Sequence, residues 1–298
     1  MSFLNSGSSG NPVIATTTTT TTRVTVPPVP DVATIAGKKA LCVGINNYPN
    51  PSNRLRGCVN DAMDWSSYLS GAYGFTSEAL LDAHATSHNF KERTGNYLVD
   101  TKSGDYVVIT YSGHGSNVRD LDGDEADGRD ECLCLYDRKF IDDELRDLFK
   151  NIHPEATLVF ISDSCHSGTV TRAFINSLVN MENPEERLLP RYLPPEDDDE
   201  ARSINLNKVA TRIFYPEENM NEILISGCLP TEYSYDARIN SRNNGAMSAN
   251  ALAILKQQRD ITFNDFYKKL RAVLPSSRYA QTPQLEGSDA NKARLMFQ

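Results

Sequence analysis

A cysteine and a histidine each follow an apolar segment of the 298-residue chain. ATLVFISDSCHSG (156–168) contains Cys165, and DYVVITYSGHGS (105–116) contains His114. A free thiol is mostly protonated near neutral pH, so a catalytic cysteine needs a nearby imidazole to take its proton and then protonate the leaving amine. The two residues are therefore candidates for a nucleophile and its base, provided that the fold brings them together.

The strands expected before His114 and Cys165 predict that the two residues lie close together. Each apolar run indicates a strand buried on both faces of a parallel sheet, and open α/β sheets place their ligands at the carboxyl ends of the strands. If the two strands are neighbours, His114 and Cys165 meet at one edge although they lie 51 residues apart. Gly113 and Gly115 would let a substrate backbone approach, and the N–H groups of Gly115 and Cys165 could hold an oxyanion.

Alternating strands and helices predict an α/β sandwich, with a largely parallel central sheet flanked by helices. We expect strands at 40–45, which we place as the first, central strand, and at 79–81, 105–112, 157–161 and 223–226. We expect helices at 59–69, at 87–99 with Ser87 as N-cap, and at 141–150, 170–179, 245–257 and 262–274. CLCLYD (132–137) suggests an accessory hairpin, and ARLMF (293–297) a last strand.

Composition divides the chain. Residues 1–36 are of low complexity, include seven consecutive threonines at 16–22, and are expected to be disordered. Residues 37–298 are expected to form one domain, in which 37–181 carries the Cys–His pair and 220–298 completes the sheet. Between them, 182–219 is rich in proline and acidic residues, which predicts a surface insertion or linker.

Charge and hydropathy exclude several classes of protein. A net charge of −9 argues against a nucleic-acid binder, which needs a basic surface to displace counterions. No apolar stretch is long enough to cross a membrane, and the N-terminus lacks the pattern of a signal peptide. The six cysteines are scattered rather than spaced as a disulfide framework, which favours a reducing compartment. We expect a cytoplasmic protein, monomeric, that binds neither nucleic acid nor membrane.

Four motifs in order resemble the metacaspases, of the caspase-like superfamily of cysteine peptidases. They are GCVNDA (57–62), YSGHGS (111–116), GDEADGRDE (123–131) and DSCHSG (163–168). Caspase-like peptidases carry a histidine about 50 residues before the cysteine, in agreement with this chain. The resemblance covers residues 38–171 well and the remainder more loosely. It implies a caspase-like α/β/α sandwich, with 37–181 and 220–298 matching the large and small subunits. It also implies an endopeptidase that cleaves after Arg or Lys, with His114 and Cys165 as its dyad.

The resemblance also implies a pocket for the basic residue of the substrate. By motif, its members fall on Cys58, Asp61, Ser112 and Asp163. Carboxylates in a partly desolvated cleft attract a guanidinium, which can bind their oxygens with a bidentate fork. Without the resemblance, Asp61 would be interpreted as part of a solvated helix face and Asp163 as a helix cap.

Calcium is the cofactor that the resemblance implies, held in the family by four aspartates. Three of them fall on Asp130, Asp142 and Asp143. At the fourth position this chain has Arg172, which removes a ligand and adds a repelling charge, so we expect a weakened site. Asp137 or a backbone carbonyl could substitute, or Arg172 could itself pair with Asp142 or Asp143.

The sequence therefore predicts a calcium-influenced cysteine endopeptidase whose partners are polypeptides with Arg or Lys before the scissile bond. We also expect self-cleavage within 182–219, which we predict to be exposed. Its candidate sites are Arg187, Arg191, Arg202, Lys208 and Arg212. The alternative is a catalytically silent caspase-fold scaffold, which labelling of Cys165 by an arginine-based reagent would distinguish.

Overall fold

The computed structural model describes residues 37–119, 129–165, 188–194, 220–229 and 231–298. Its main sheet has six strands in the order β12-β9-β7-β3-β1-β2. In chain order these are β1 (Lys38–Gly44), β2 (Thr76–Leu81), β3 (Tyr106–Ser112), β7 (Thr157–Asp163), β9 (Glu222–Ser226) and β12 (Gln284–Glu286). The tail at 1–36, the helix expected at 170–179 and most of the motif GDEADGRDE (123–131) lie outside the described residues.

All neighbouring strands of this sheet run parallel except β12, which pairs antiparallel with β9 at one edge. The expected mixed α/β fold with a largely parallel sheet is confirmed. The central position of β1 was wrong, because β1 lies second from the edge, between β2 and β3. Its apolar sequence could not reveal this, since any strand covered on both faces is equally apolar.

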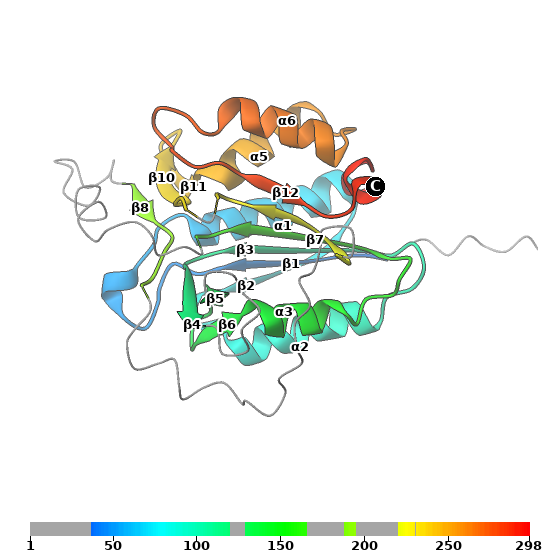
Figure 1. Cartoon of the computed structure of the whole chain (residues 1–298), viewed down its shortest axis with the longest axis horizontal. Coiled ribbons are helices and arrows are strands. Elements are labelled where there is room, and N and C mark those ends of the chain that lie inside the picture. The colour runs from blue at the N-terminus through cyan, green and yellow to red at the C-terminus, as the bar shows by residue number, and fades with distance from the viewer. Residues whose placement is uncertain (1–36, 120–128, 166–187, 195–219, 230) are drawn as a thin grey trace, which may run out of the picture. The chain divides into compact units, whose positions relative to one another are not determined.

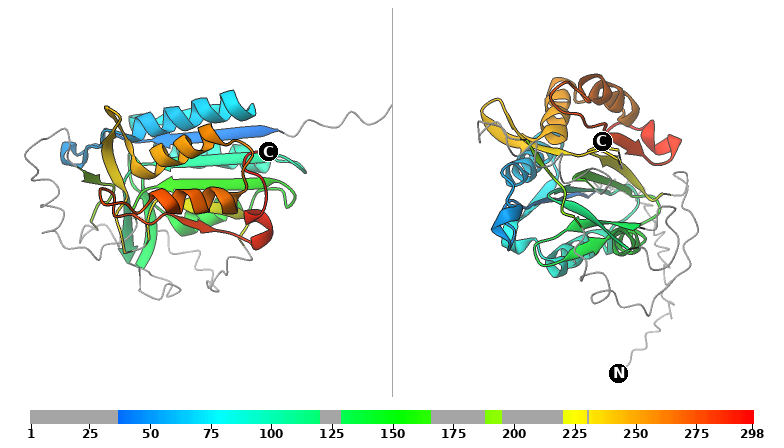
Figure 2. Two further views of the ribbon diagram at one scale, coloured as in Figure 1. Left: turned by 90° about the horizontal axis from the view of Figure 1, so that it is seen from above. Right: turned by 60° about the vertical axis from the view of Figure 1, so that its left-hand side comes forward.

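Helices cover both faces of the sheet, as Figure 1 shows. One face packs against α1 (Cys58–Tyr73), α5 (Ala246–Gln257) and α6 (Phe263–Val273), which lie side by side in Figure 2. The other face packs against α2 (Ser87–Val99) and α3 (Asp142–Phe149). Successive residues of β1 alternate between the two cores: Ala40 and Cys42 face the first, and Leu41 and Val43 the second. The α/β/α sandwich therefore follows directly from strands that are apolar on both sides.

Two small antiparallel sheets lie beyond the main one. The first contains β4 (Gly115–Arg119), β5 (Arg129–Cys134) and β6 (Lys139–Ile141), so the apolar piece CLCLYD does form part of an accessory sheet. The second contains β8 (Leu189–Pro190), β10 (Tyr235–Ile239) and β11 (Arg242–Gly245), which the sequence did not predict. Two short helical turns (Pro51–Asn53 and Asp82–His84) and α7 (Asp289–Lys292) complete the elements.

Two local predictions were wrong. The N-cap of α2 is Thr86 rather than Ser87, because the Thr86 side chain accepts a hydrogen bond from the N–H of Asn89. The segment ARLMF does not form a strand, since the last strand is β12 and 293–297 instead buries Met296 and Phe297 in the core. No helix in the described ranges is long and apolar enough to span a bilayer.

Candidate active site

The site lies where β3 and β7 end. These neighbours are parallel, and their register pairs Ser112 with Asp163, the last residue of each strand. His114 and Cys165 each follow two residues later, so the chain carries both past the same edge of the sheet. Both residues are buried.

The His114 ring is held in one orientation. Its Nε2 lies 2.8 Å from the carbonyl oxygen of Asn53, and its ring packs against Tyr48 with centroids 4.9 Å apart. A carbonyl oxygen can only accept, so Nε2 carries the proton and Nδ1 keeps a lone pair. Nδ1 has no hydrogen-bond partner among the described residues. Burial lowers the pKa of His114 from 6.5 to about 4, so the ring is neutral near pH 7 and can act as a base.

Two backbone donors converge on one carbonyl oxygen beside Cys165. The N–H of Gly115 and the N–H of Cys165 both donate to the carbonyl oxygen of Arg191, at 2.9 and 3.2 Å. The Cys165 thiol donates to the carbonyl oxygen of Ser234 at 3.3 Å and accepts from its N–H at 2.7 Å. The thiol makes no hydrogen bond to His114 in the part of the chain described. The fold thus brings the pair to one edge without a direct hydrogen bond.

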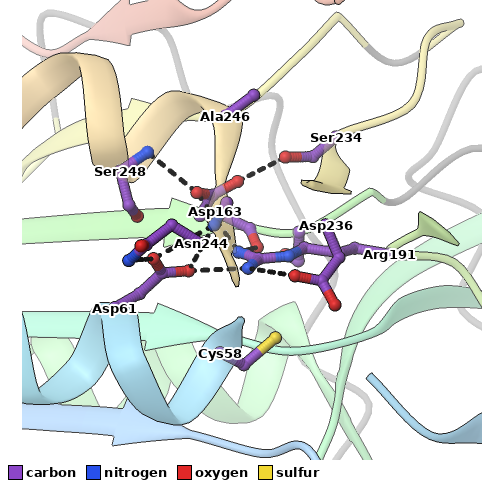
Figure 3. A network of polar contacts seen from close by, with 12 residues as sticks. Cys58, Asp61, Asp163, Arg191, Ser234, Asp236, Asn244, Ala246 and Ser248 are labelled. Atoms are coloured by element: carbon purple, nitrogen blue, oxygen red, sulfur yellow. Dashed lines mark hydrogen bonds and ion pairs between the residues drawn. The ribbon is translucent and has the colours of Figure 1, made fainter. Parts of the chain in front are cut away.

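The side chain of Arg191 fills a buried acidic pocket next to this carbonyl (Figure 3). Its Nη2 donates to Oδ2 of Asp61 at 2.6 Å, and its Nη1 lies 3.2 Å from Oδ2 of Asp163. A third carboxylate, Asp236, places Oδ1 3.7 Å from Nη2. Nη1 also donates to the carbonyl oxygen of Asp163 at 3.0 Å. Two pocket residues predicted from the sequence, Asp61 and Asp163, therefore bind a guanidinium together.

Helix N-termini and side-chain donors hold the first two carboxylates in place. Asp61, in the first turn of α1, accepts from Nδ2 of Asn244 at 2.8 Å and from the N–H of Gly245 at 3.0 Å. Asp163 accepts from the Ser234 hydroxyl and from the N–H of Ser248, in the first turn of α5, at 2.9 Å. The positive end of a helix dipole favours a carboxylate there. Burial raises the pKa of Asp61 to about 7, against the lowering effect of the Arg191 charge.

The pocket leaves no room for side chains at two of its walls. A Cβ atom on Gly245 would overlap the carboxylate of Asp163 and the guanidinium of Arg191, and one on Gly57 would overlap Oδ1 of Asp236. Gly57 belongs to the GCVNDA motif and Gly245 precedes α5. Glycine at position 245 therefore leaves room for the guanidinium beside Asp163, and glycine at position 57 leaves room for the carboxylate of Asp236.

The backbone on either side of Arg191 is bound as an extended strand. Leu189 and Pro190 pair antiparallel with β10, and the N–H of Arg191 donates to the carbonyl oxygen of Ser234 at 2.9 Å. On the other side, Tyr192 forms a parallel bridge with Gly115, whose carbonyl accepts from the N–H of Leu193 at 2.9 Å. A stretch of the chain itself therefore lies through the cleft, with Arg191 in the pocket.

This finding corrects the description of 182–219 as an exposed linker, at least for residues 188–194. Leu188, Pro190, Arg191 and Tyr192 are buried, and Arg191 has no exposed surface. The physical reason is that three carboxylates and a row of backbone donors outweigh the polar, proline-rich surroundings. The other candidate self-cleavage sites, Arg187, Arg202, Lys208 and Arg212, lie outside the described residues.

The two remaining members of the predicted pocket lie close by. Cys58 opens α1, is fully buried, and lies beside Arg191 in Figure 3. Burial raises the pKa of the Cys58 thiol, so this side chain stays protonated and lines the pocket without a charge. Ser112 is buried at the end of β3, opposite Asp163 in the register.

The three predicted calcium ligands come from one region of the accessory sheet. Asp130 lies on β5, while Asp142 and Asp143 open α3 directly after β6, the strand paired with β5. Oδ2 of Asp142 pairs with Nη2 of Arg146 at 2.5 Å. Asp137, considered as a substitute, instead caps α2 by accepting from the N–H and hydroxyl of Ser87, at 2.6 and 2.8 Å. In the described residues no three His, Cys, Asp or Glu side chains gather as a metal site, and Arg172 lies outside them. The calcium site therefore stays a prediction from the sequence.

Comparison with protein families decides the identity of the fold and its chemistry. The family model described as "Caspase domain" matches residues 37–294. The chain belongs to the caspase family of cysteine peptidases. The match begins where the described structure begins and includes both residues of the predicted dyad.

Within this family the chain is similar to the metacaspases. It is 29% identical to metacaspase-1 of Kluyveromyces lactis over 87% of this chain and 68% of that protein. It is also 29% identical to metacaspase-1 of Schizosaccharomyces pombe, over 89% and 71% of the two chains. The expected metacaspase resemblance is thus confirmed.

Solved structures agree on the caspase fold. A protein from Geobacter sulfurreducens superposes with a TM-score of 0.69 at 26% identity, covering 88% of this chain and 98% of that one. Caspase-1 from Spodoptera frugiperda superposes with a TM-score of 0.54 at 12% identity, covering 85% and 87%, which shows the fold alone.

Sequence reasoning missed several residues of this caspase-type site, among them Asp236 and Asn53. Asp236 was overlooked because YSYDARIN carries no strong strand pattern, and Asn53 because it acts through its backbone carbonyl. Arg191 was noticed, but only as one of several cleavable residues. A usable signal existed in LLPRYL (188–193), an apolar run around one arginine within an otherwise polar segment.

Proposed function

We propose that this cysteine peptidase is an endopeptidase that cleaves polypeptides after arginine or lysine, with Cys165 as nucleophile and His114 as base. The observation that carries this proposal is the placement of Arg191. Its guanidinium contacts Asp61 and Asp163 while its carbonyl oxygen accepts from Gly115 and Cys165. One residue thus occupies a specificity pocket and an oxyanion site at once, as the residue before a scissile bond must.

The chemistry follows from this arrangement. Nδ1 of His114 takes the thiol proton, and the sulfur of Cys165 attacks the carbonyl carbon of the basic residue. The negative charge that develops on the carbonyl oxygen is stabilised by the N–H groups of Gly115 and Cys165. The imidazolium then protonates the leaving amine, which gives a thioester, and water that His114 deprotonates hydrolyses it. For attack, the thiol must turn from Ser234 toward the carbonyl carbon.

We further propose that the chain cleaves itself at the Arg191–Tyr192 bond. The segment around this bond is already paired on both sides, with β10 before the bond and with Gly115 after it. The first cut therefore takes place within one molecule, at a rate independent of protein concentration. All pocket side chains come from one chain, so catalysis as a monomer is sufficient.

For calcium we propose weak, modest stimulation rather than an absolute requirement. Oδ2 of Asp142 is already paired with Arg146, so an ion that used this oxygen would have to displace the guanidinium. Affinity for calcium follows the number of charged ligands, and Arg172 replaces one of them. Calorimetric titration with a parallel activity curve tests this. Tight binding, with no activity below low micromolar calcium, would contradict it.

Two experiments test the peptidase proposal. An irreversible arginine-based inhibitor should label Cys165 in the wild-type chain and leave Cys165→Ala unlabelled, whereas a silent scaffold would not react in either form. Peptides ending in Arg, Lys and Asp should show cleavage after the first two only, and equal cleavage after Asp would overturn the pocket assignment.

Mass spectrometry of the incubated chain should find a new N-terminus at Tyr192. An intact chain under conditions in which Arg peptides are cleaved would overturn self-cleavage.

The six cysteines are all free, which suits a reducing compartment. We therefore propose that the enzyme acts in the cytoplasm. Fractionation that places the active chain in an oxidising compartment would contradict this.

A further inference from the structure

Asp236 closes the pocket on a side that Asp61 and Asp163 leave open (Figure 3). It lies on β10, and only 1% of its surface is exposed. Its Oδ2 accepts from the N–H of Arg56 at 2.5 Å, which anchors the carboxylate to the backbone before α1. Its Oδ1 points at the guanidinium, 3.7 Å from Nη2 of Arg191. One oxygen therefore holds the side chain in place, and the other faces the bound cation.

The two oxygens of Asp236 differ in how they are satisfied. Oδ1 is buried and accepts no hydrogen bond within the described ranges. In Asp61 and in Asp163, by contrast, both carboxylate oxygens accept from donors other than Arg191, namely Asn244, Gly245, Ser234 and Ser248. A buried acceptor without a partner costs free energy, more so when it is charged. An oxygen left in that state beside the pocket is suited to bind the cation.

Arginine and lysine reach this oxygen differently. Nη2 of Arg191 lies between Asp61, at 2.6 Å, and Asp236, at 3.7 Å, while Nη1 serves Asp163. Two nitrogens of the rigid, planar guanidinium thus contact three carboxylates. A lysine side chain ends one bond earlier, in a single nitrogen that acts as a point charge. That nitrogen can bind the nearer acids, but it ends one bond short of the position from which Nη2 of Arg191 reaches both Asp61 and Asp236.

We propose that Asp236 is a specificity-determining residue that makes this peptidase prefer arginine over lysine before the scissile bond. This inference rests on the proposed function, in which the Arg191 pocket is the substrate pocket. The inference narrows the preferred residue before the scissile bond from any basic residue to arginine. It attributes the preference for arginine over lysine to the side chain of Asp236.

The experiment compares two fluorogenic peptides that copy the bound segment, Leu-Pro-Arg and Leu-Pro-Lys, on the full chain. The ratio of their kcat/KM values is unaffected by competition from the enzyme's own segment, because both peptides compete with it equally. We expect the wild type to prefer the Arg peptide by about tenfold or more, because only arginine gains the buried ion pair with Asp236. In Asp236→Asn the Arg value should fall by about tenfold or more and the Lys value by less than about threefold.

Asn keeps an oxygen that can accept from the N–H of Arg56, so this change removes the charge and not the anchor. Asp289→Asn is the matched control, since it removes an exposed carboxylate outside the pocket and should leave the ratio unchanged. Thermal unfolding of each variant measures any general loss of structure.

Each outcome separates the specificity role from a structural one. Equal falls for both peptides in Asp236→Asn would mean that Asp236 only supports the fold, and would overturn the inference. A wild-type enzyme that cleaves both peptides equally would overturn it without any variant. Asp236→Glu restores the charge, so it should recover part of the Arg preference. If the wild type cleaves neither peptide and an arginine-based inhibitor leaves Cys165 unlabelled, the proposed function itself is wrong.

Discussion

Removal of the Arg191 side chain should open the active site to external substrates. In the intact chain the guanidinium has no exposed surface and contacts Asp61, Asp163 and Asp236. Truncating one partner of a buried, hydrogen-bonded charge pair costs about 2–5 kcal/mol. At about 1.4 kcal/mol for each factor of ten, the closure of the segment on its own site weakens by at least about 30-fold. Four backbone hydrogen bonds around Arg191 remain, so the segment keeps some affinity.

The assay uses the Cys165→Ala background, in which no bond is cut and occupancy alone is measured. An Arg peptide with a fluorescent label is titrated by anisotropy against chains with Arg191 and with Arg191→Ala. We expect the peptide to bind at least about tenfold more tightly to Arg191→Ala, because a tethered competitor at an effective concentration in the millimolar range has been weakened. Arg278→Ala, which changes an arginine outside the pocket, should bind as the parent does.

The result that would refute this reasoning is equal peptide affinity in the two chains. It would mean that the segment does not exclude ligands from the pocket. Weaker binding to Arg191→Ala would be a stronger contradiction, since it would mean that Arg191 supports the pocket rather than competing for it. Arg191→Lys should lie between the two, because a lysine retains a charge but reaches fewer of the acids.

Three further outcomes follow from the same geometry. Asp163→Asn should lower kcat/KM for Arg peptides by about 30-fold or more, by the same loss of a buried charge pair, and an unchanged value in steady-state assays would exclude Asp163 from the pocket. Gly245→Ala should abolish labelling of Cys165 by an arginine-based inhibitor while circular dichroism shows a folded chain, because the added methyl group overlaps Asp163 and the guanidinium. Burial raises the pKa of Asp61 to about 7 even with the Arg191 guanidinium in the pocket, so this pKa lies higher when the pocket is empty. Only the ionised carboxylate attracts a cation and kcat/KM reports the free enzyme, so kcat/KM for Arg peptides should rise from about pH 7 to about pH 9 and fall on acidification. The pKa of His114, lowered by burial to about 4, puts its titration below this window, so a flat profile there would contradict the role of Asp61.

The sequence predicted those parts of the site that lie next to strong local patterns. β3 and β7 are fully buried apolar runs, so their ends could be located, and with them His114, Cys165 and Asp163. That these strands are neighbours in register is a tertiary fact, and no local pattern shows which parallel strands pair. The same limit explains the misplaced β1, whose apolar sequence fits any covered position in a parallel sheet.

The parts that sequence reasoning missed depend on pairing between distant segments. β8 has only two residues and is a strand because it pairs with β10. The strand propensity of so short a segment could not indicate it. Residues 188–194 do lie outside the main sheet, as the composition of 182–219 suggests, yet composition averages over this short stretch that binds. A buried arginine in an acidic, proline-rich segment becomes visible only once three carboxylates from α1, β7 and β10 converge on it.

The convergence of these three carboxylates also explains why the intact chain binds its own arginine. Three acids in one buried pocket repel one another, and burial raises the pKa values of both Asp61 and Asp236, which favours their neutral forms. A bound guanidinium lowers both values, so it keeps the pocket in the charged form that a substrate needs. Arg191 thus stabilises the substrate-ready pocket in the uncut chain, and the same contacts place its carbonyl oxygen between the N–H groups of Gly115 and Cys165. Self-cleavage and substrate recognition therefore use the same pocket contacts, so a substitution of a pocket carboxylate that weakens one should weaken the other.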